Sequence, residues 1–294
     1  MKFRKNRKGN IKMKYSFFTV GAQEYGLEEI LNKLKQYGYD GVEWRVKALD
    51  ISSLDGYGEG AIDLNFIEEN AIKIKQLCEK KGMEIIALAT YLRPDQKPEI
   101  EKVLRAARLM NCRQIRIGTP LYQGDIPYPQ LFGKTVRDIE ALIPAAKENG
   151  VRINVEIHFG KLIPSCSAAY RLVSNFDPSL IGVIHDAGNM VMEGYENWQM
   201  GLELLGPYLA HVHVKNYKWF IKQTLDDGTF VWQSEPESLK KGQANFREIL
   251  KALKHVDYDG YLSFEDFSPK ETAEEKLKNN IIYLKNIYNE ISNL

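Results

Sequence analysis

Cysteine is scarce in this chain of 294 residues, which contains only Cys78, Cys112 and Cys166. Three scattered thiols are too few for a disulfide framework or a zinc knuckle. We therefore expect a reducing compartment and a cytoplasmic protein. Cys166 has no neighbouring pattern that marks it as a nucleophile, so we assign it no role.

The sequence also lacks any hydrophobic run approaching the roughly 18 apolar residues that mark a membrane span. Its net charge is only +1, which argues against a general attraction to nucleic acid or to an anionic membrane. A glycine-rich phosphate loop of the Walker type is absent as well. We expect neither nucleic acid nor membrane as a partner and favour a small-molecule substrate.

The first 12 residues contain six Lys or Arg but no apolar core. They lack the hydrophobic stretch of a secretory signal, and we expect residues 1–12 to form a flexible basic tail. Binding of RNA or lipid by this tail is the alternative. The whole chain has 44% hydrophobic and 27% charged residues, which is typical of a globular protein with a large core.

Strand and helix patterns alternate strictly along residues 13–294. The expected strands are 15–20, 41–45, 84–90, 114–118, 152–158, 181–186, 210–215 and 261–265. The expected helices are 27–37, 65–81, 98–110, one ending near 150, 167–174, 198–205, 246–254 and 271–291. Right-handed crossovers would close these eight units into an α/β fold, a single-domain (β/α)8 TIM barrel.

One segment, residues 217–242, is longer than an ordinary loop between a strand and a helix. It carries Trp219, Phe220, Phe230 and Trp232 around Asp226-Asp227-Gly228. Asp-Gly between strand-like arms is a strong turn signal, so we expect an inserted hairpin after strand seven. It is a lid, a subunit contact in a homo-oligomer, or an insertion without function.

Four late strands end in side chains that commonly bind metals. The segments are Asn154-Val155-Glu156-Ile157-His158, Ile184-His185-Asp186, His211-Val212-His213 and Ser263-Phe264-Glu265. Within the first, third and fourth segments the ionisable side chains share one face and the apolar ones the other. In a barrel the apolar face meets the helices and the ionised face meets the axis, where a bound cation would remove the cost of unpaired charge. A half-exposed antiparallel sheet is the alternative.

These segments, with His185-Asp186-Ala187-Gly188-Asn189, His211-Val212-His213-Val214-Lys215 and Gly260-Tyr261-Leu262-Ser263-Phe264-Glu265, resemble the xylose isomerase-like, AP endonuclease family 2 superfamily. The resemblance covers residues 13–294. Members include sugar and sugar-phosphate epimerases, hydroxypyruvate isomerase, inosose dehydratase and endonuclease IV.

The resemblance implies that Glu156, Asp186, His213 and Glu265 bind one divalent metal ion. Three carboxylates and one imidazole suit Mn, Mg or Co and accept Zn, so the sequence does not select among them. It further implies a metal-dependent isomerase or epimerase of a small sugar or sugar phosphate. Glu156 and Glu265 would act as acid and base, moving a proton through an enediolate that the metal stabilises.

Five further residues are expected to contact the carbohydrate substrate: His158, Asn189, Lys215, Arg45 and Trp219. Each has a structural alternative. His158 could instead orient Glu156, Lys215 could face solvent at the rim, and Arg45 could form an ion pair with Glu43. His211 is either a site residue or a packed core histidine.

Two positions depart from the resembled family. Asn189 stands where several members carry histidine, and Asn216 follows Lys215 where aspartate is frequent. The first histidine of the chain is His158, so a trinuclear site of the endonuclease IV type is not expected. Two other functions remain open: a lyase such as inosose dehydratase, and a catalytically silent barrel that binds carbohydrate.

Overall fold

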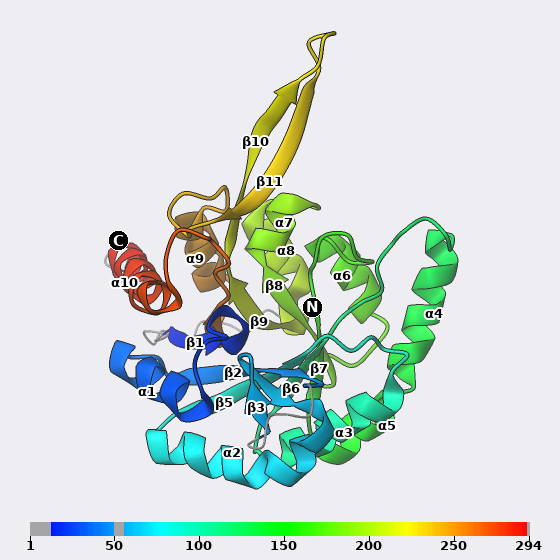
Figure 1. Ribbon diagram of the computed structural model, residues 1–294. Coiled ribbons are helices and arrows are strands. Elements are labelled where there is room, and N and C mark those ends of the chain that lie inside the picture. Colours follow the sequence, from blue (N-terminus) through cyan, green and yellow to red (C-terminus); the bar gives the residue numbers. More distant parts are fainter. Residues whose placement is uncertain (1–12, 50–55, 293–294) are drawn as a thin grey trace.

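A closed parallel barrel forms the body of the protein (Figure 1). The computed structural model describes residues 13–49 and 56–292. Eight parallel strands pair in the order β1-β12-β9-β8-β7-β6-β5-β2, and β2 pairs again with β1. The predicted TIM barrel is confirmed and the antiparallel alternative is wrong. The predicted basic tail, residues 1–12, and residues 50–55 after β2 lie outside the described residues.

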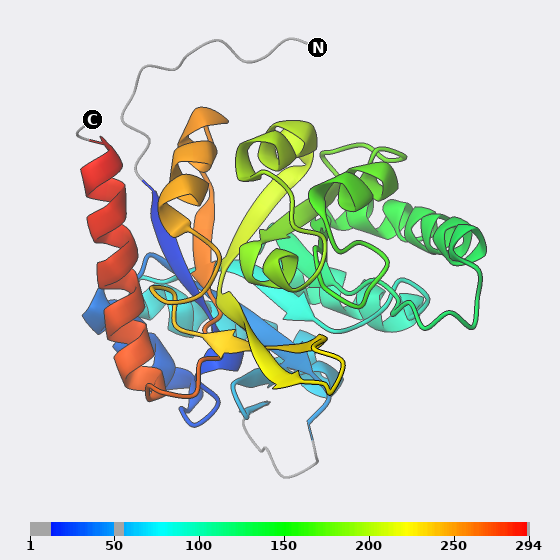
Figure 2. The same ribbon diagram turned by 90° about the horizontal axis from the view of Figure 1, so that it is seen from above.

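The barrel strands are β1 (Lys14–Phe18), β2 (Gly41–Lys47), β5 (Glu84–Thr90), β6 (Gln114–Ile117), β7 (Arg152–Glu156), β8 (Ile181–Asp186), β9 (Leu209–Val214) and β12 (Tyr261–Phe264). The helices are α1 (Leu27–Tyr37), α2 (Ile67–Lys81), α3 (Lys97–Leu109), α4 (Tyr128–Glu140), α5 (Ile143–Asn149), α6 (Cys166–Val173), α7 (Ala187–Met192), α8 (Trp198–Leu205), α9 (Phe246–His255) and α10 (Ala273–Ser292). Helix α10 packs against α9 and α1, which completes the outer ring (Figure 2). No helix among the described residues is long and apolar enough to cross a membrane.

Predicted helix ends coincide with glycines. Gly38 and Gly82 follow α1 and α2 with φ angles of 78° and 71°, and the N–H of each bonds back to carbonyls of the last turn. A side chain would be strained in this left-handed conformation, whereas glycine adopts it freely.

One helix prediction is wrong, and one helix was not predicted. The single helix expected before residue 150 is divided into α4 and α5, because Pro144 in the first turn of α5 has no N–H to continue the hydrogen-bond ladder. The short helix α7 was not expected. It begins where the Asp186 carboxylate accepts a hydrogen bond from the backbone N–H of Asn189.

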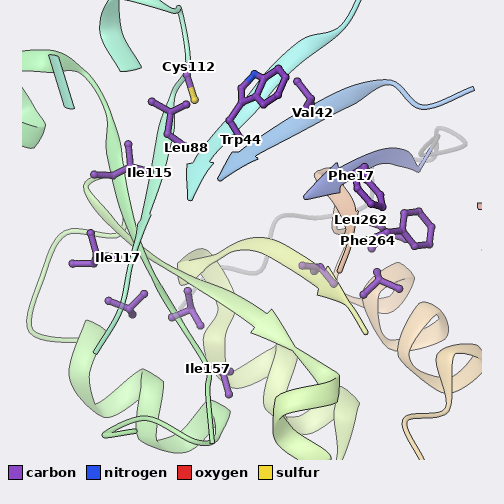
Figure 3. Packing of buried hydrophobic residues seen from close by; sticks show 14 of the residues in the cluster. Phe17, Val42, Trp44, Leu88, Cys112, Ile115, Ile117, Ile157, Leu262 and Phe264 are labelled. Carbon is purple, nitrogen blue, oxygen red and sulfur yellow. The ribbon is translucent and has the colours of Figure 1, made fainter. Parts of the chain in front are cut away.

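The outer face of the barrel is apolar, as the alternation predicted. Val42, Trp44, Leu88 and Phe264 belong to the large buried cluster between the sheet and the helices (Figure 3). In sequence, each is flanked by a residue of opposite parity that faces the axis. Burial of this layer supplies the main favourable term in folding.

The inner face is polar and equally buried. Glu43, Arg116, Asn154, Glu156 and His213 are all at most 2% exposed. A small second cluster of Phe18, Val20 and Ala89 is separate from the main core. Because buried charges are costly unless paired, the inner polar residues must compensate one another or a ligand.

Two further strand pairs lie at the rim of the barrel. Strand β4 (Ala61–Asp63) extends the sheet beside β2, and β3 (Tyr57–Gly58) pairs with β4. Strands β10 (Asn216–Thr224) and β11 (Phe230–Glu237) form an antiparallel hairpin with Asp227 and Gly228 in the turn. Figure 1 shows this hairpin projecting away from the barrel.

Asn216 fixes the base of the hairpin. Its side-chain amide donates to the carbonyls of Leu239 and Ala244, both at 3.0 Å. Its Oδ1 accepts from the backbone N–H groups of Ala244 at 2.9 Å and Tyr217 at 3.0 Å. An aspartate could not donate to the two carbonyls, so the departure from the family pattern at this position has a structural reason.

We predict that Asn216→Ala lowers the free energy of unfolding by about 1–3 kcal/mol, because it leaves buried donors and acceptors without partners. Urea unfolding followed by circular dichroism measures the change. Asn286→Ala, on the exposed side of α10, is the matched control and should leave the midpoint unchanged. Equal midpoints for the two variants would contradict this role of Asn216.

Candidate metal centre

Four side chains from β7, β8, β9 and the end of β12 converge at the carboxyl-terminal mouth of the barrel. One ligand atom each from Glu156, Asp186, His213 and Glu265 lies within 4.8 Å of all the others. His213 Nδ1 is 3.0 Å from Glu156 Oε1, 3.5 Å from Glu265 Oε2 and 3.7 Å from Asp186 Oδ2. The structure thus brings together the complete predicted ligand set.

Local structure aims the Asp186 carboxylate at this cluster. Its Oδ1 accepts from the N–H of Asn189 at the start of α7. Its Oδ2 faces the cluster and lies 2.9 Å from Lys215 Nζ. Helix capping therefore uses one oxygen and leaves the other for a ligand.

A second acid orients the imidazole of His213. Glu43 Oε1 on β2 lies 3.1 Å from His213 Nε2, and Glu43 Oε2 lies 2.9 Å from His211 Nε2. A carboxylate accepts hydrogen bonds, so the hydrogen on Nε2 of His213 points to Glu43, and Nδ1 faces the cluster, where it can bind a metal ion once it has lost its proton. Phe18 stacks on the ring at 5.6 Å between centroids and limits its rotation.

Two buried cations accompany the carboxylates. Lys215 Nζ is 2.7 Å from Glu265 Oε2 and 2.9 Å from Asp186 Oδ2. Arg116 Nη2 is 2.6 Å from Glu156 Oε2. Lys215 is only 3% exposed, so the alternative of a solvent-facing rim lysine is wrong.

The charges of this group fit a divalent cation. Glu43, Glu156, Asp186 and Glu265 carry four negative charges when ionised, whereas Arg116 and Lys215 carry two permanent positive charges. With His213 neutral, as a metal ligand must be, two negative charges remain, and the Lys215 ammonium already lies among the oxygens that would bind a cation. Three carboxylates and an imidazole are suitable donors for a divalent ion.

The buried charges of the site also shift the pKa values of its members. Burial opposes protonation of His213, but Glu43 and the three cluster carboxylates outweigh it and raise the pKa of His213 well above its usual range. Burial raises the pKa of Glu156, but Arg116 and Lys215 outweigh it and hold that pKa well below the usual range. The carboxylate is therefore ionised at neutral pH.

The predicted substrate contacts lie in different environments. His158 is partly buried with Nδ1 2.7 Å from the carbonyl of Phe159. Asn189 is fully buried and donates from Nδ2 to the carbonyl of Ile157, while its Oδ1 has no partner among the described residues. Arg45 donates to the carbonyl of Glu59 and lies over the ring of Tyr91.

Trp219 uses its indole N–H inside the protein. Its Nε1 donates to the carbonyl of Val191 at 2.7 Å, which attaches the hairpin to α7. Contact of Trp219 with substrate stays a prediction, as it does for the other four residues.

The sequence did not reveal the role of Arg116. The ion pair of Arg45 with Glu43, given above as an alternative, is wrong, because Glu43 pairs with His211 and His213. Arg116 lies between Ile115 and Ile117 with inward parity. A charged residue between two apolar ones in a strand is the sequence feature that could have identified Arg116 as a residue facing the barrel axis.

Comparison with known proteins adds a family model described as xylose isomerase-like TIM barrel, which matches residues 31–287. Inosose dehydratase of Clostridium perfringens is 24% identical over 176 residues, covering 56% of this chain and 57% of that protein. The chain thus matches little more than half the length of this curated relative.

Solved structures share the fold. The 3-keto-D-glucoside 4-epimerase from E. coli superposes with a TM-score of 0.71 at 15% identity, covering 94% of this chain and 100% of that one. The IolI protein with a bound zinc atom gives a TM-score of 0.72 at 18% identity, covering 95% and 99%.

We predict that Glu43→Gln weakens divalent-metal binding by about 10- to 100-fold, because the imidazole loses the charged partner that fixes its orientation and increases its basicity. Calorimetric titration of chelator-treated protein with Mn²⁺ measures the affinity. Glu99→Gln, on the exposed side of α3, is the control. An unchanged affinity for the Glu43 variant would show that Glu43 does not support the metal ligand.

Proposed function

Because the chain belongs to the family of xylose isomerase-like TIM barrels, we propose that it is a divalent-metal-dependent isomerase or epimerase of a small sugar or sugar phosphate. The observation that carries the proposal is the convergence of Glu156, Asp186, His213 and Glu265 within 4.8 Å. Related structures include a D-psicose 3-epimerase determined with D-fructose. Mn, Mg, Co and Zn all suit the donor set, and the native ion is left open.

The chain's own carboxylates would move the proton. Glu156 and Glu265 come from strands separated by β8 and β9, so they can face a substrate from two directions. One would remove the proton next to the carbonyl and the other would return it, with each transfer contributing roughly 10²- to 10⁴-fold in rate. A bound divalent cation would supply Lewis-acid stabilisation of the enediolate.

Lys215 and Arg116 would keep the two catalytic carboxylates ionised. Burial raises the pKa of Glu265, but Lys215 and His213 outweigh it and lower that pKa below its usual value. Arg116 does the same for Glu156 through their ion pair. The carboxylate that removes the substrate proton would therefore begin the cycle ionised, and the one that returns a proton would first take one up from solvent.

A second candidate is a lyase of the inosose dehydratase type, which His158 favours. The Phe159 carbonyl can only accept, so the nearby Nδ1 of His158 carries the hydrogen and Nε2 keeps its lone pair. Burial lowers the pKa of His158 and keeps the ring neutral at pH 7. A base two residues beyond Glu156 and outside the ligand cluster could serve an elimination, and a relative named inosose dehydratase accords with it.

We predict that the Mn²⁺-loaded protein incorporates solvent deuterium at carbon when incubated with ketoses in D₂O, and that Glu265→Gln lowers the exchange rate at least about 100-fold. NMR of the recovered sugar measures the exchange. Removal of the metal with a chelator should stop it, and Mn²⁺ should restore it.

The control is Glu271→Gln, which changes a carboxylate in the loop before α10. Dehydrated product from inososes would favour the lyase instead. Absence of both reactions across the panel would favour the silent carbohydrate-binding barrel, and full exchange by the Glu265 variant would remove that residue from the mechanism.

The hairpin has a proposed role as a subunit contact. Ile221, Phe230 and Trp232 share one face of it and are 45%, 51% and 55% exposed. Three neighbouring apolar side chains in water, on a two-stranded unit that projects from the barrel, favour burial against another surface.

We predict that changing these three residues together to Ser lowers the mass of the assembly measured by light scattering. Unchanged mass with reduced turnover would support a lid instead. If both mass and turnover stayed the same, the hairpin would be neither a contact nor a lid.

A further inference from the structure

Arg116 has more hydrogen-bonding capacity than its surroundings use. It is 2% exposed, and its Nη2 pairs with Glu156. Its Nε and Nη1 have no hydrogen-bond partner among the described residues. The guanidinium lies 4.8 Å from the centre of the Tyr91 ring and 5.6 Å from that of Phe18. Buried N–H donors are almost always satisfied, so two vacant ones beside the metal centre point to a ligand.

Lys161 is a second unpaired cation in the same place. Among the described residues its ammonium has no hydrogen bond or ion pair, although the side chain is only partly exposed. A Cβ built on Gly118, two residues beyond Arg116, would lie 3.5 Å from Lys161 Nζ. The missing side chain at Gly118 leaves room for the ammonium close to Arg116.

The charged groups of the metal centre act on Lys161. Burial lowers the pKa of Lys161, Glu156 and Glu265 oppose this change, and Arg116 and Lys215 lower the pKa further. A partly exposed lysine that shares these two carboxylates with two other cations is stabilised by a further anion.

The charge of the metal-loaded site also favours binding of an anion. A divalent ion together with Arg116 and Lys215 balances the four carboxylates of the centre. The charge of Lys161 is then in excess, and the partly exposed Arg45, which lies 5.5 Å from the Tyr91 ring, adds another at the rim. A neutral sugar would leave this excess unchanged.

We propose that Arg116 and Lys161 form a subsite for an oxyanion of the substrate, a carboxylate or a phosphate, beside the metal centre. This inference rests on the proposed function and narrows its substrate class to anionic carbonyl sugars. Arginine N–H groups match the oxygens of either anion, and the ammonium adds a point charge.

Binding of three ketoses to the Mn²⁺-loaded protein tests the subsite. D-fructose is neutral, D-fructose 6-phosphate carries a phosphate and 2-keto-D-gluconate carries a carboxylate. Calorimetric titration should give at least one of the two anions an affinity about 10-fold or more above that of D-fructose, in line with a charged hydrogen bond. The anion that is preferred identifies the source of the negative charge.

Lys161→Gln should remove this preference without weakening D-fructose binding, whereas Lys134→Gln, on the exposed surface of α4, should keep it. Thermal unfolding of both variants shows that the fold is retained. The inference is overturned if neither anion is preferred, including the case in which none of the three sugars binds, or if the preference survives in Lys161→Gln.

Deuterium exchange separates this failure from failure of the proposed function. Exchange with D-fructose alone would leave the isomerase proposal intact and refute the subsite. Preferred binding of an anion without exchange or elimination on any sugar would support the subsite and refute the enzyme.

Discussion

The compensation of buried negative charge is the constraint on which the rest of this structure depends. Glu156, Asp186 and Glu265 point their oxygens at one region on the barrel axis, with Glu43 behind them, and water is almost excluded. Such a group is tolerable only when cations are placed among the oxygens. Arg116 and Lys215 supply part of the positive charge, and a divalent ion is the simplest source of the remainder.

The barrel makes this arrangement possible through the parity of its strands. Outward side chains such as Val155 and Val212 join the apolar layer beneath the helices, which stabilises the fold. Their neighbours Glu156 and His213 must then face the axis. The same alternation that builds the core therefore assembles the site. His185, whose parity is outward, packs against Trp198 of α8 and takes no part in the cluster.

Most of the fold could be predicted because it follows from local patterns, and the periodicity located the barrel strands. The ligand set could be predicted because the ends of four strands resemble those of a known family. The pairing of Glu43 with His213 could not be predicted, because the two residues are 170 positions apart and only barrel closure brings them together. The unsatisfied donors of Arg116 likewise depend on Tyr91 and Glu156, from two other strands or their ends. The division of α4 from α5 depended on Pro144, whose effect the helical periodicity concealed.

Elemental analysis of the protein after chelation, reconstitution with Mn²⁺ and removal of free metal tests the central claim most directly. The account predicts one ion per chain, and none in a folded variant carrying Asp186→Asn together with Glu265→Gln. A folded wild-type protein that retains no ion, or a double variant that retains one as tightly, would contradict the assignment of these carboxylates as a metal centre.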